Sequence, residues 1–293
     1  MKNLFKLFGI IALAAVIGFS FATCGGDDSG GDGGDENKND NSNANNEYWR
    51  TSKYKTYTVK DGVANLAGEG VYNYITDRYT SDTNNERKYT ITYTSYDTTT
   101  TSSVATYHDT RNGQTNVSTY ESATETRTNI YTYDSESGLQ LEQSYTSTSN
   151  SGGTTTTTSF EVTYNIVLLS DADGVKTYKV SYKTYTYNGN SQDVSARNYQ
   201  ECKIQNGRTL EQKTFGADGN LQSTDTNTYP DNAVIRAKLP YFMLNSYSSS
   251  KQTQTVELLS DSETELVIRV NGFWNNVLLQ YYDYTYEKAS RSK

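Results

Sequence analysis

Residues 88–97 read KYTITYTSYD, and this stretch indicates the fold class. Its large apolar side chains, Tyr89, Ile91 and Tyr93, alternate with threonines. A period of two places the two sets on opposite faces of a β-strand. Aromatic and β-branched residues also favour a pleated, half-buried surface. The stretch therefore predicts a strand with one tyrosine face and one threonine face.

The same pattern recurs along most of the chain. Strand-length segments alternate with turn signals between residues 53 and 286, and Asn112-Gly113 is of the type that most strongly signals a hairpin. No intervening segment has the length of the crossover that parallel strands need. We therefore expect an all-β fold, an antiparallel meander of about a dozen strands. It could form a large curved sheet, a sandwich or a partly closed barrel.

One segment lacks the alternation. Residues 231–244 contain clustered apolar side chains and are interrupted by Pro240. This pattern predicts a short helix that begins after Asp231 and ends near the proline. We expect the helix to lie over an open end of the sheet, as a lid or plug.

The composition narrows the function classes. Tyrosine is the commonest aromatic residue, at 27 against 8 Phe and 2 Trp, and the mean hydropathy of −0.78 predicts a thin core built largely from tyrosine. The net charge is −8 and the pI about 4.8. Because phosphate contacts need clustered Lys and Arg, a nucleic-acid partner is not expected.

No catalytic, metal or cofactor motif is complete. His108 is the only histidine, which rules out two-histidine metal sites, and no Gly-x-Ser-x-Gly motif accompanies it. Asp171-Ala172-Asp173-Gly174 resembles the start of a calcium loop, but Tyr182 stands where the loop needs its last carboxylate. We interpret His108 as a strand or turn residue and 171–174 as a β-turn. We expect no catalytic residues, no metal and no cofactor.

The N-terminus has the three parts of a signal peptide. Lys2 and Lys6 precede the largely apolar run 7–21, which is shorter than the about 20 residues of a membrane-spanning helix. Residues 25–46 are mostly Gly, Asp, Asn and Ser, so they cannot bury enough surface to fold. We expect residues 1–23 to be a signal peptide, 24–46 a tether that spans roughly 25 Å, and 47–293 the β-rich domain.

Phe21-Ala22-Thr23-Cys24 resembles the bacterial lipobox. The resemblance implies that Cys24 receives a diacylglyceryl group on its sulfur, and that its new amino group carries a further acyl chain such as palmitate. It also implies a place in the cell envelope, anchored to a membrane through this lipid. Gly25 after the cysteine favours the outer membrane. With Cys24 acylated, Cys202 has no disulfide partner and is interpreted as a small apolar residue on the inner face of a strand.

The body of the chain resembles no family closely. Two turns, at residues 133–139 and 215–221, are similar to those of YD-type (Rhs-like) repeats, but no regular repeat period continues along the chain. The threonine faces, such as residues 154–158, are too polar for the lipid-facing band of an outer-membrane barrel, and we reject that interpretation.

Four aromatic residues are candidate contacts for a ligand or partner: Trp49, Phe273, Trp274 and Tyr282. Phe273 and Trp274 follow the turn signal Asn271-Gly272. Such rings can stack on sugars or anchor a protein, although they could equally pack in the sheet's own core.

The favoured function is a non-enzymatic, membrane-anchored domain for binding or structure, whose partner is an unknown protein, glycan or lipid. One alternative is a barrel-like carrier of an apolar ligand or lipid, with 231–244 as its lid. Another is a hydrolase of envelope polymers.

Overall fold

The computed structural model describes residues 47–290 apart from 82–83, 97–99, 193, 195–196, 207, 241 and 248–250. The predictions for the signal peptide, Cys24 and the tether lie outside the described residues. Within the described residues, no helix combines the length and the apolar character needed to pass through a membrane.

The chain is almost entirely β-structure, with one short helix. In chain order the elements are β1 (Glu47–Lys60), β2 (Val63–Ser81), β3 (Asn84–Ser95), β4 (Thr101–Asn112), β5 (Thr115–Glu121), β6 (Glu125–Tyr133), β7 (Gln140–Ser151), β8 (Thr154–Ala172), β9 (Val175–Tyr187), β10 (Asn190–Ser191), β11 (Tyr199–Gln205), β12 (Arg208–Phe215), β13 (Leu221–Thr228), α2 (Ala233–Lys238), β14 (Leu244–Tyr247), β15 (Gln252–Asp261), β16 (Glu265–Trp274) and β17 (Val277–Ser290).

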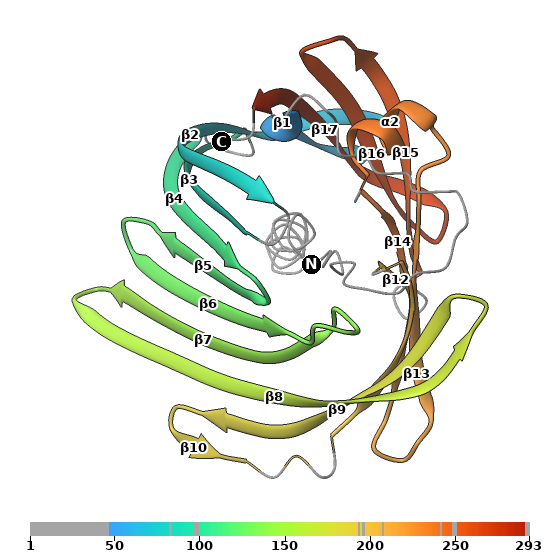
Figure 1. Ribbon diagram of the computed structural model, residues 1–293. Coiled ribbons are helices and arrows are strands. Elements are labelled where there is room, and N and C mark those ends of the chain that lie inside the picture. Colours follow the sequence, from blue (N-terminus) through green and yellow to red (C-terminus); the bar gives the residue numbers. More distant parts are fainter. Residues whose placement is uncertain are drawn as a thin grey trace.

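These strands form one antiparallel sheet that closes on itself. Each strand pairs with the next in sequence, except that β10 pairs only with β9, and β9 pairs onward with β11. Closure comes from β1, which pairs with both β2 and β17. Figure 1 shows the sheet curving round until its first and last strands lie side by side. The predicted all-β antiparallel meander is confirmed. Of the three expected forms it takes the barrel, with sixteen strands in the ring of described residues and β10 outside it.

The hairpin turns follow from residues that tolerate positive φ. Asp61-Gly62 has φ values of 52° and 77°, and Asp173-Gly174 has 54° and 75°. These are the conformations that a two-residue hairpin turn needs, which Asp, Asn and Gly adopt most easily. The interpretation of 171–174 as a plain turn is confirmed. The Asn271-Gly272 signal was wrong, because those residues lie inside β16 and the turn is made by Asn275 and Asn276, at φ 49° and 62°.

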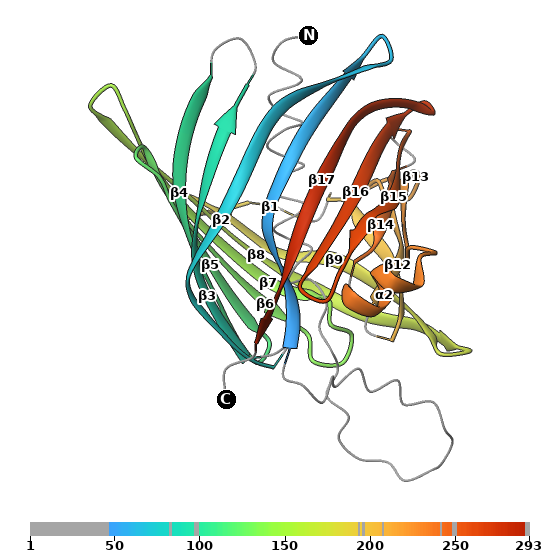
Figure 2. The ribbon, with the colours of Figure 1, turned by 90° about the horizontal axis from the view of Figure 1, so that it is seen from above.

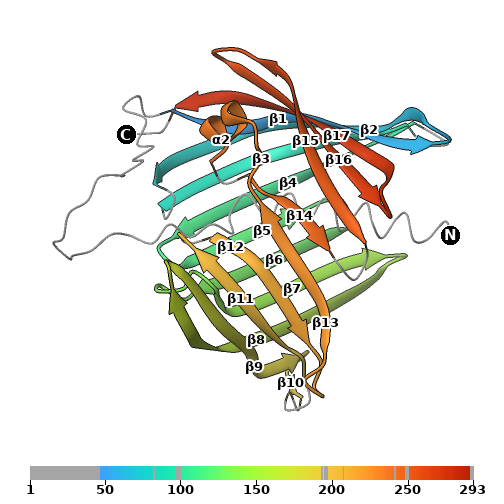
Figure 3. The ribbon, with the colours of Figure 1, turned by 90° about the vertical axis from the view of Figure 1, so that its right-hand side faces the viewer.

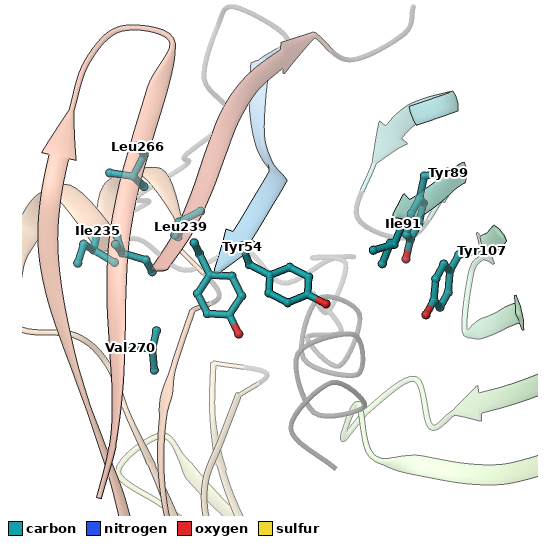
Figure 4. Packing of buried hydrophobic residues seen from close by; sticks show 10 residues of the cluster. Tyr54, Tyr89, Ile91, Tyr107, Ile235, Leu239, Leu266 and Val270 are labelled. Atoms are coloured by element: carbon teal, nitrogen blue, oxygen red, sulfur yellow. The ribbon is translucent and has the colours of Figure 1, made fainter. Parts of the chain in front are cut away.

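The register places most tyrosines on one face of the sheet and most threonines on the other. Tyr54 lies opposite Tyr284, and Tyr89 opposite Tyr107. All four belong to one buried cluster that draws on strands on both sides of the β1–β2 pair. Figure 4 shows Tyr54 and Tyr107 pointing to the side that the sheet encloses. We call this side the inner face. Thr90, on the opposite face of β3, points outward.

The predicted helix is confirmed as α2, which is shorter than the segment 231–244. The Asn232 side chain accepts hydrogen bonds from the backbone N–H groups of Val234 and Ile235, at 2.9 and 3.1 Å, and so caps the helix. Ile235 is fully buried in the same cluster as Leu266. Figures 2 and 3 show α2 at the end of the barrel where β17 finishes. A helix of six residues covers only an arc of that end.

Candidate functional site: the inner face

The inner face carries a band of aromatic rings that runs from β17 through β1 to β9. Neighbouring rings lie close around the wall, with centroids 5.2 Å apart for Tyr89 and Tyr107 and 5.3 Å for Tyr107 and Tyr120. By register, the tyrosines of this band include Tyr54, Tyr72, Tyr74, Tyr89, Tyr93, Tyr107, Tyr120, Tyr131, Tyr145, Tyr164, Tyr178, Tyr182, Tyr185, Tyr187, Tyr282, Tyr284 and Tyr286. Contacts at these spacings are typical of offset-stacked and edge-to-face ring pairs.

The tyrosine hydroxyls of this band are protonated at neutral pH, and burial extends this protonation to more alkaline pH. Desolvation raises the pKa of Tyr107 to about 12 and the pKa of Tyr282 to about 12. At neutral pH these side chains are therefore uncharged and can both donate and accept hydrogen bonds. The band offers apolar ring faces together with neutral polar hydroxyls.

The wall between β5 and β9 is less densely covered. Tyr145 and Phe160 stack with centroids 5.0 Å apart, and both side chains remain half-buried. Barrels of about eight strands are filled by their own side chains, whereas those with 16–18 strands leave an interior wider than the side chains fill. A ring of sixteen strands thus leaves rings such as these open to contact from inside.

Asp109 places a carboxylate in this tyrosine wall. Its Oδ2 accepts a hydrogen bond from the Tyr89 hydroxyl at 2.9 Å, and its Oδ1 accepts one from the Ser118 hydroxyl at 2.5 Å. Asp109 is 2% exposed. Desolvation raises the pKa of this carboxyl, although both hydrogen bonds and the Arg87 charge oppose the shift. The site therefore favours neutral Asp109 more than water does.

A charged cluster closes a gap in the wall at one end. Pairing between β1 and β2 stops at Lys53 and Val71, so the first residues of β1 and the second half of β2 are not joined through their backbones. Arg50 spans the gap, with its guanidinium 2.5 Å from Asp77 and 4.1 Å from the centroid of the Tyr74 ring. The Tyr74 hydroxyl also donates to the carbonyl of Thr51 at 2.8 Å. Side-chain contacts therefore replace the missing backbone hydrogen bonds between β1 and β2 here.

Replacing Asp109 with asparagine is expected to stabilise the protein at pH 8 and to change little at pH 4. A carboxyl whose pKa is raised on folding contributes stability below its unfolded pKa, near 4, and loses that contribution as pH rises through the folded pKa. Asparagine has no charge to bury. Thermal unfolding at both pH values measures the effect.

Asp218→Asn is the matched control for this prediction. The exposed Asp218 carboxylate accepts two hydrogen bonds from Asn220, which lower its pKa. Its contribution to stability is present above the unfolded pKa and lost as pH falls, so Asp218→Asn should act with the opposite sign. A stabilising effect of Asp109→Asn that is equal at pH 4 and pH 8 would contradict the assignment.

The structure does not bring the four predicted contact residues together. Trp49 lies near the start of β1, where the Lys238 ammonium sits 4.4 Å from its ring centroid. Phe273 and Trp274 end β16 at the opposite end of the barrel, and Trp274 is 43% exposed. Tyr282 belongs to the inner face between them. These residues therefore do not form a single site.

The other residues noted in the sequence have structural positions. His108 lies in β4 on the outer face, with its Nε2 3.0 Å from Glu86 Oε1, and the interpretation as a strand histidine is confirmed. Cys202 is free and buried on the inner face opposite Tyr178, as expected. Desolvation raises its thiol pKa to about 12, so it is an inert residue of the wall. The described residues include no group of three or more side chains that could hold a metal ion.

Two features of the inner face were missed in the sequence. Asp109 stands two residues after Tyr107, so strict alternation already put it on the tyrosine face. Tyr145 and Phe160 each lie in a predicted strand, but their pairing depends on the register between β7 and β8. Only the first of these features had a local signal.

Comparison with known proteins adds no family. The chain matches no protein-family model, and no curated protein is detectably similar to it. The geometry of the barrel is therefore the basis for a functional proposal.

Proposed function

We propose that this protein is an envelope-anchored binding protein that holds an apolar or aromatic-containing ligand against the tyrosine-lined inner face of its barrel. The observation that carries the proposal is the closed sheet with most of its tyrosines inside and most of its threonines outside. The inner face has the larger share of ring surface, and a ligand buried there is removed from water.

The chemistry of the wall supports an amphipathic ligand. Its ring faces favour apolar or planar groups, and its neutral hydroxyls can hydrogen-bond polar ones. The Asp109 carboxyl adds a buried group whose pKa is raised by desolvation. This proposal unites the two non-enzymatic functions expected from the sequence.

The anchor is the second part of the proposal and rests on the lipobox-like residues before Cys24. It is tested by growing cells with labelled palmitate, where the chain should become labelled and Cys24→Ala should not. Labelling that survives in Cys24→Ala would contradict an anchor at this residue, without affecting the proposal for the inner face.

Removing the stacked pair Tyr145–Phe160 should weaken binding of an apolar dye by about thirtyfold, because each of the two lost ring contacts contributes about 1 kcal/mol beyond its buried area. The probe is N-phenyl-1-naphthylamine, whose emission rises in apolar surroundings. It is titrated into the full chain and into Tyr145→Ser/Phe160→Ser, and the dissociation constants are compared.

The matched control is a second stacked pair on the outer face. Tyr199 and Phe215 stack with centroids 4.8 Å apart and an interplanar angle of 7°. Tyr199→Ser/Phe215→Ser removes the same chemistry from the opposite side of the wall and should leave dye affinity unchanged. Equal weakening by both double variants, or no saturable binding at all, would overturn the proposal of an inner-face site.

A further inference from the structure

The hairpin of β8 and β9 carries an open strand edge. Pairing between β7 and β8 ends at Glu142 and Thr163, whereas β8 continues beside β9 to Ala172. Apart from its bonds to β9, no backbone hydrogen bond among the described residues reaches Tyr164–Ala172. In Figure 2 this hairpin extends past the neighbouring strands at the lower right. Its free edge presents unpaired N–H and C=O groups.

The side chains on this edge are apolar and uncharged. Val167, Leu168 and Leu169 are 44%, 46% and 49% exposed. No residue from Tyr164 to Ser170 carries a charge. Exposed edge strands are normally protected by lysines, prolines or bulges. Here a register shift between Leu168 and Ser170 limits the regular edge to Tyr164–Leu168, but no charged residue protects it.

The hairpin turn beside this edge is acidic. Asp171 and Asp173 are exposed, and Glu136 of the neighbouring loop lies 3.5 Å from Lys176, which pairs with Asp171. With Asp134 in the same loop, four carboxylates face one lysine at this corner. A basic group is therefore favoured next to the turn.

We propose that the β8 edge is a docking site for an extended peptide segment of another protein, with aliphatic side chains and a basic end that lies against the acidic turn. Such a segment would add a strand to the sheet, with backbone hydrogen bonds supplying much of the affinity. A second copy of this chain fits less well. Symmetric pairing of two β8 edges would offer the acidic turn no basic residue, because residues 164–170 carry no charge.

The test uses two synthetic peptides with the full chain. The first peptide is acetyl-Lys-Lys-Val-Thr-Val-Thr-Val-amide, which places its lysines beside the turn when it binds antiparallel to β8. The second, comparison peptide has two glutamates in place of the two lysines. We expect the lysine peptide to bind at least about tenfold more tightly at low salt and the difference to shrink in high salt. Hydrogen exchange of the backbone amides in 164–170 should slow when it binds.

Val167→Lys should abolish this binding, because it places a charge in the middle of the edge. The matched control is Ile130→Lys, which adds the same charge at an exposed position of β6 that is paired on both sides. Equal affinity for the two peptides, protection outside 164–170, or equal loss in both variants would overturn the proposal. So would a dimer in sedimentation that Val167→Lys dissociates, because the edge would then bind its own copy.

Discussion

Replacing Leu266 with alanine is expected to destabilise the protein by about 2–5 kcal/mol, because a fully buried leucine leaves both lost transfer energy and a cavity. Leu266 has no exposed surface, and it packs in one cluster with Ile235 of α2 and Ile268 of β16. Its loss therefore weakens the contact that holds the helix against the sheet. The apparent melting temperature should fall by about 10 °C for a domain of this size.

Leu259→Ala is the control for this prediction. Leu259 lies on the neighbouring strand β15 but is 44% exposed, so the same truncation should change stability by less than about 0.5 kcal/mol. Chemical denaturation of both variants, with unchanged m-values, measures the difference. Equal stability of the two variants would show that the α2 cluster does not support the barrel.

Replacing Gly70 with alanine is expected to cost about 1–3 kcal/mol or more through overpacking. A Cβ atom added at Gly70 would lie 2.2 Å from Tyr54 Cε1, well inside van der Waals contact. Tyr54 cannot move aside freely, because it is 4% exposed and its ring centroid lies 6.1–6.4 Å from those of Tyr72, Tyr93 and Tyr284. A glycine inside a strand here marks the close approach of a ring to the backbone.

Two comparisons isolate this cause. Gly272→Ala, also on the inner face, would place its Cβ 3.3 Å from the flexible Gln280 side chain and 3.6 Å from the Gln280 carbonyl oxygen, and should be nearly neutral. In a Tyr54→Leu background the cost of Gly70→Ala should shrink, since the ring is gone, which a double-mutant cycle of unfolding free energies measures. An undiminished cost in that background would mean that glycine acts at this position through its backbone alone.

Local patterns accounted for the strands and their faces. The alternation of Tyr89, Ile91 and Tyr93 with threonine specified both the strand and its buried side, because side chains on a strand have a strict period of two. The turns at Asp61-Gly62 and Asp173-Gly174 were also local, since they need residues that accept positive φ. The turn at Asn275-Asn276 was missed because asparagine accepts such φ values without a neighbouring glycine.

The candidate site was only partly predictable, because local patterns assign a residue to a face of its strand but not to its neighbours in the barrel. Cys202 was placed on the inner face by alternation, whereas the separation of Trp49 from Trp274 follows from their positions at opposite ends of the barrel. The open edge of β8 likewise exists because pairing with β7 stops at Thr163, whereas pairing with β9 continues to Ala172. This difference is a property of the neighbouring strands together and not of either sequence alone.

The sequence by itself determined an antiparallel all-β chain with a tyrosine face, a threonine face and one short helix. Only the tertiary structure decided that the sheet closes and that the tyrosine face becomes an interior. Closure depends on pairing between β1 and β17, where Arg50 bonds Glu287 across 237 residues of sequence. Twist and bulges accumulate over the whole ring before these strands meet, so no local pattern can encode whether they do.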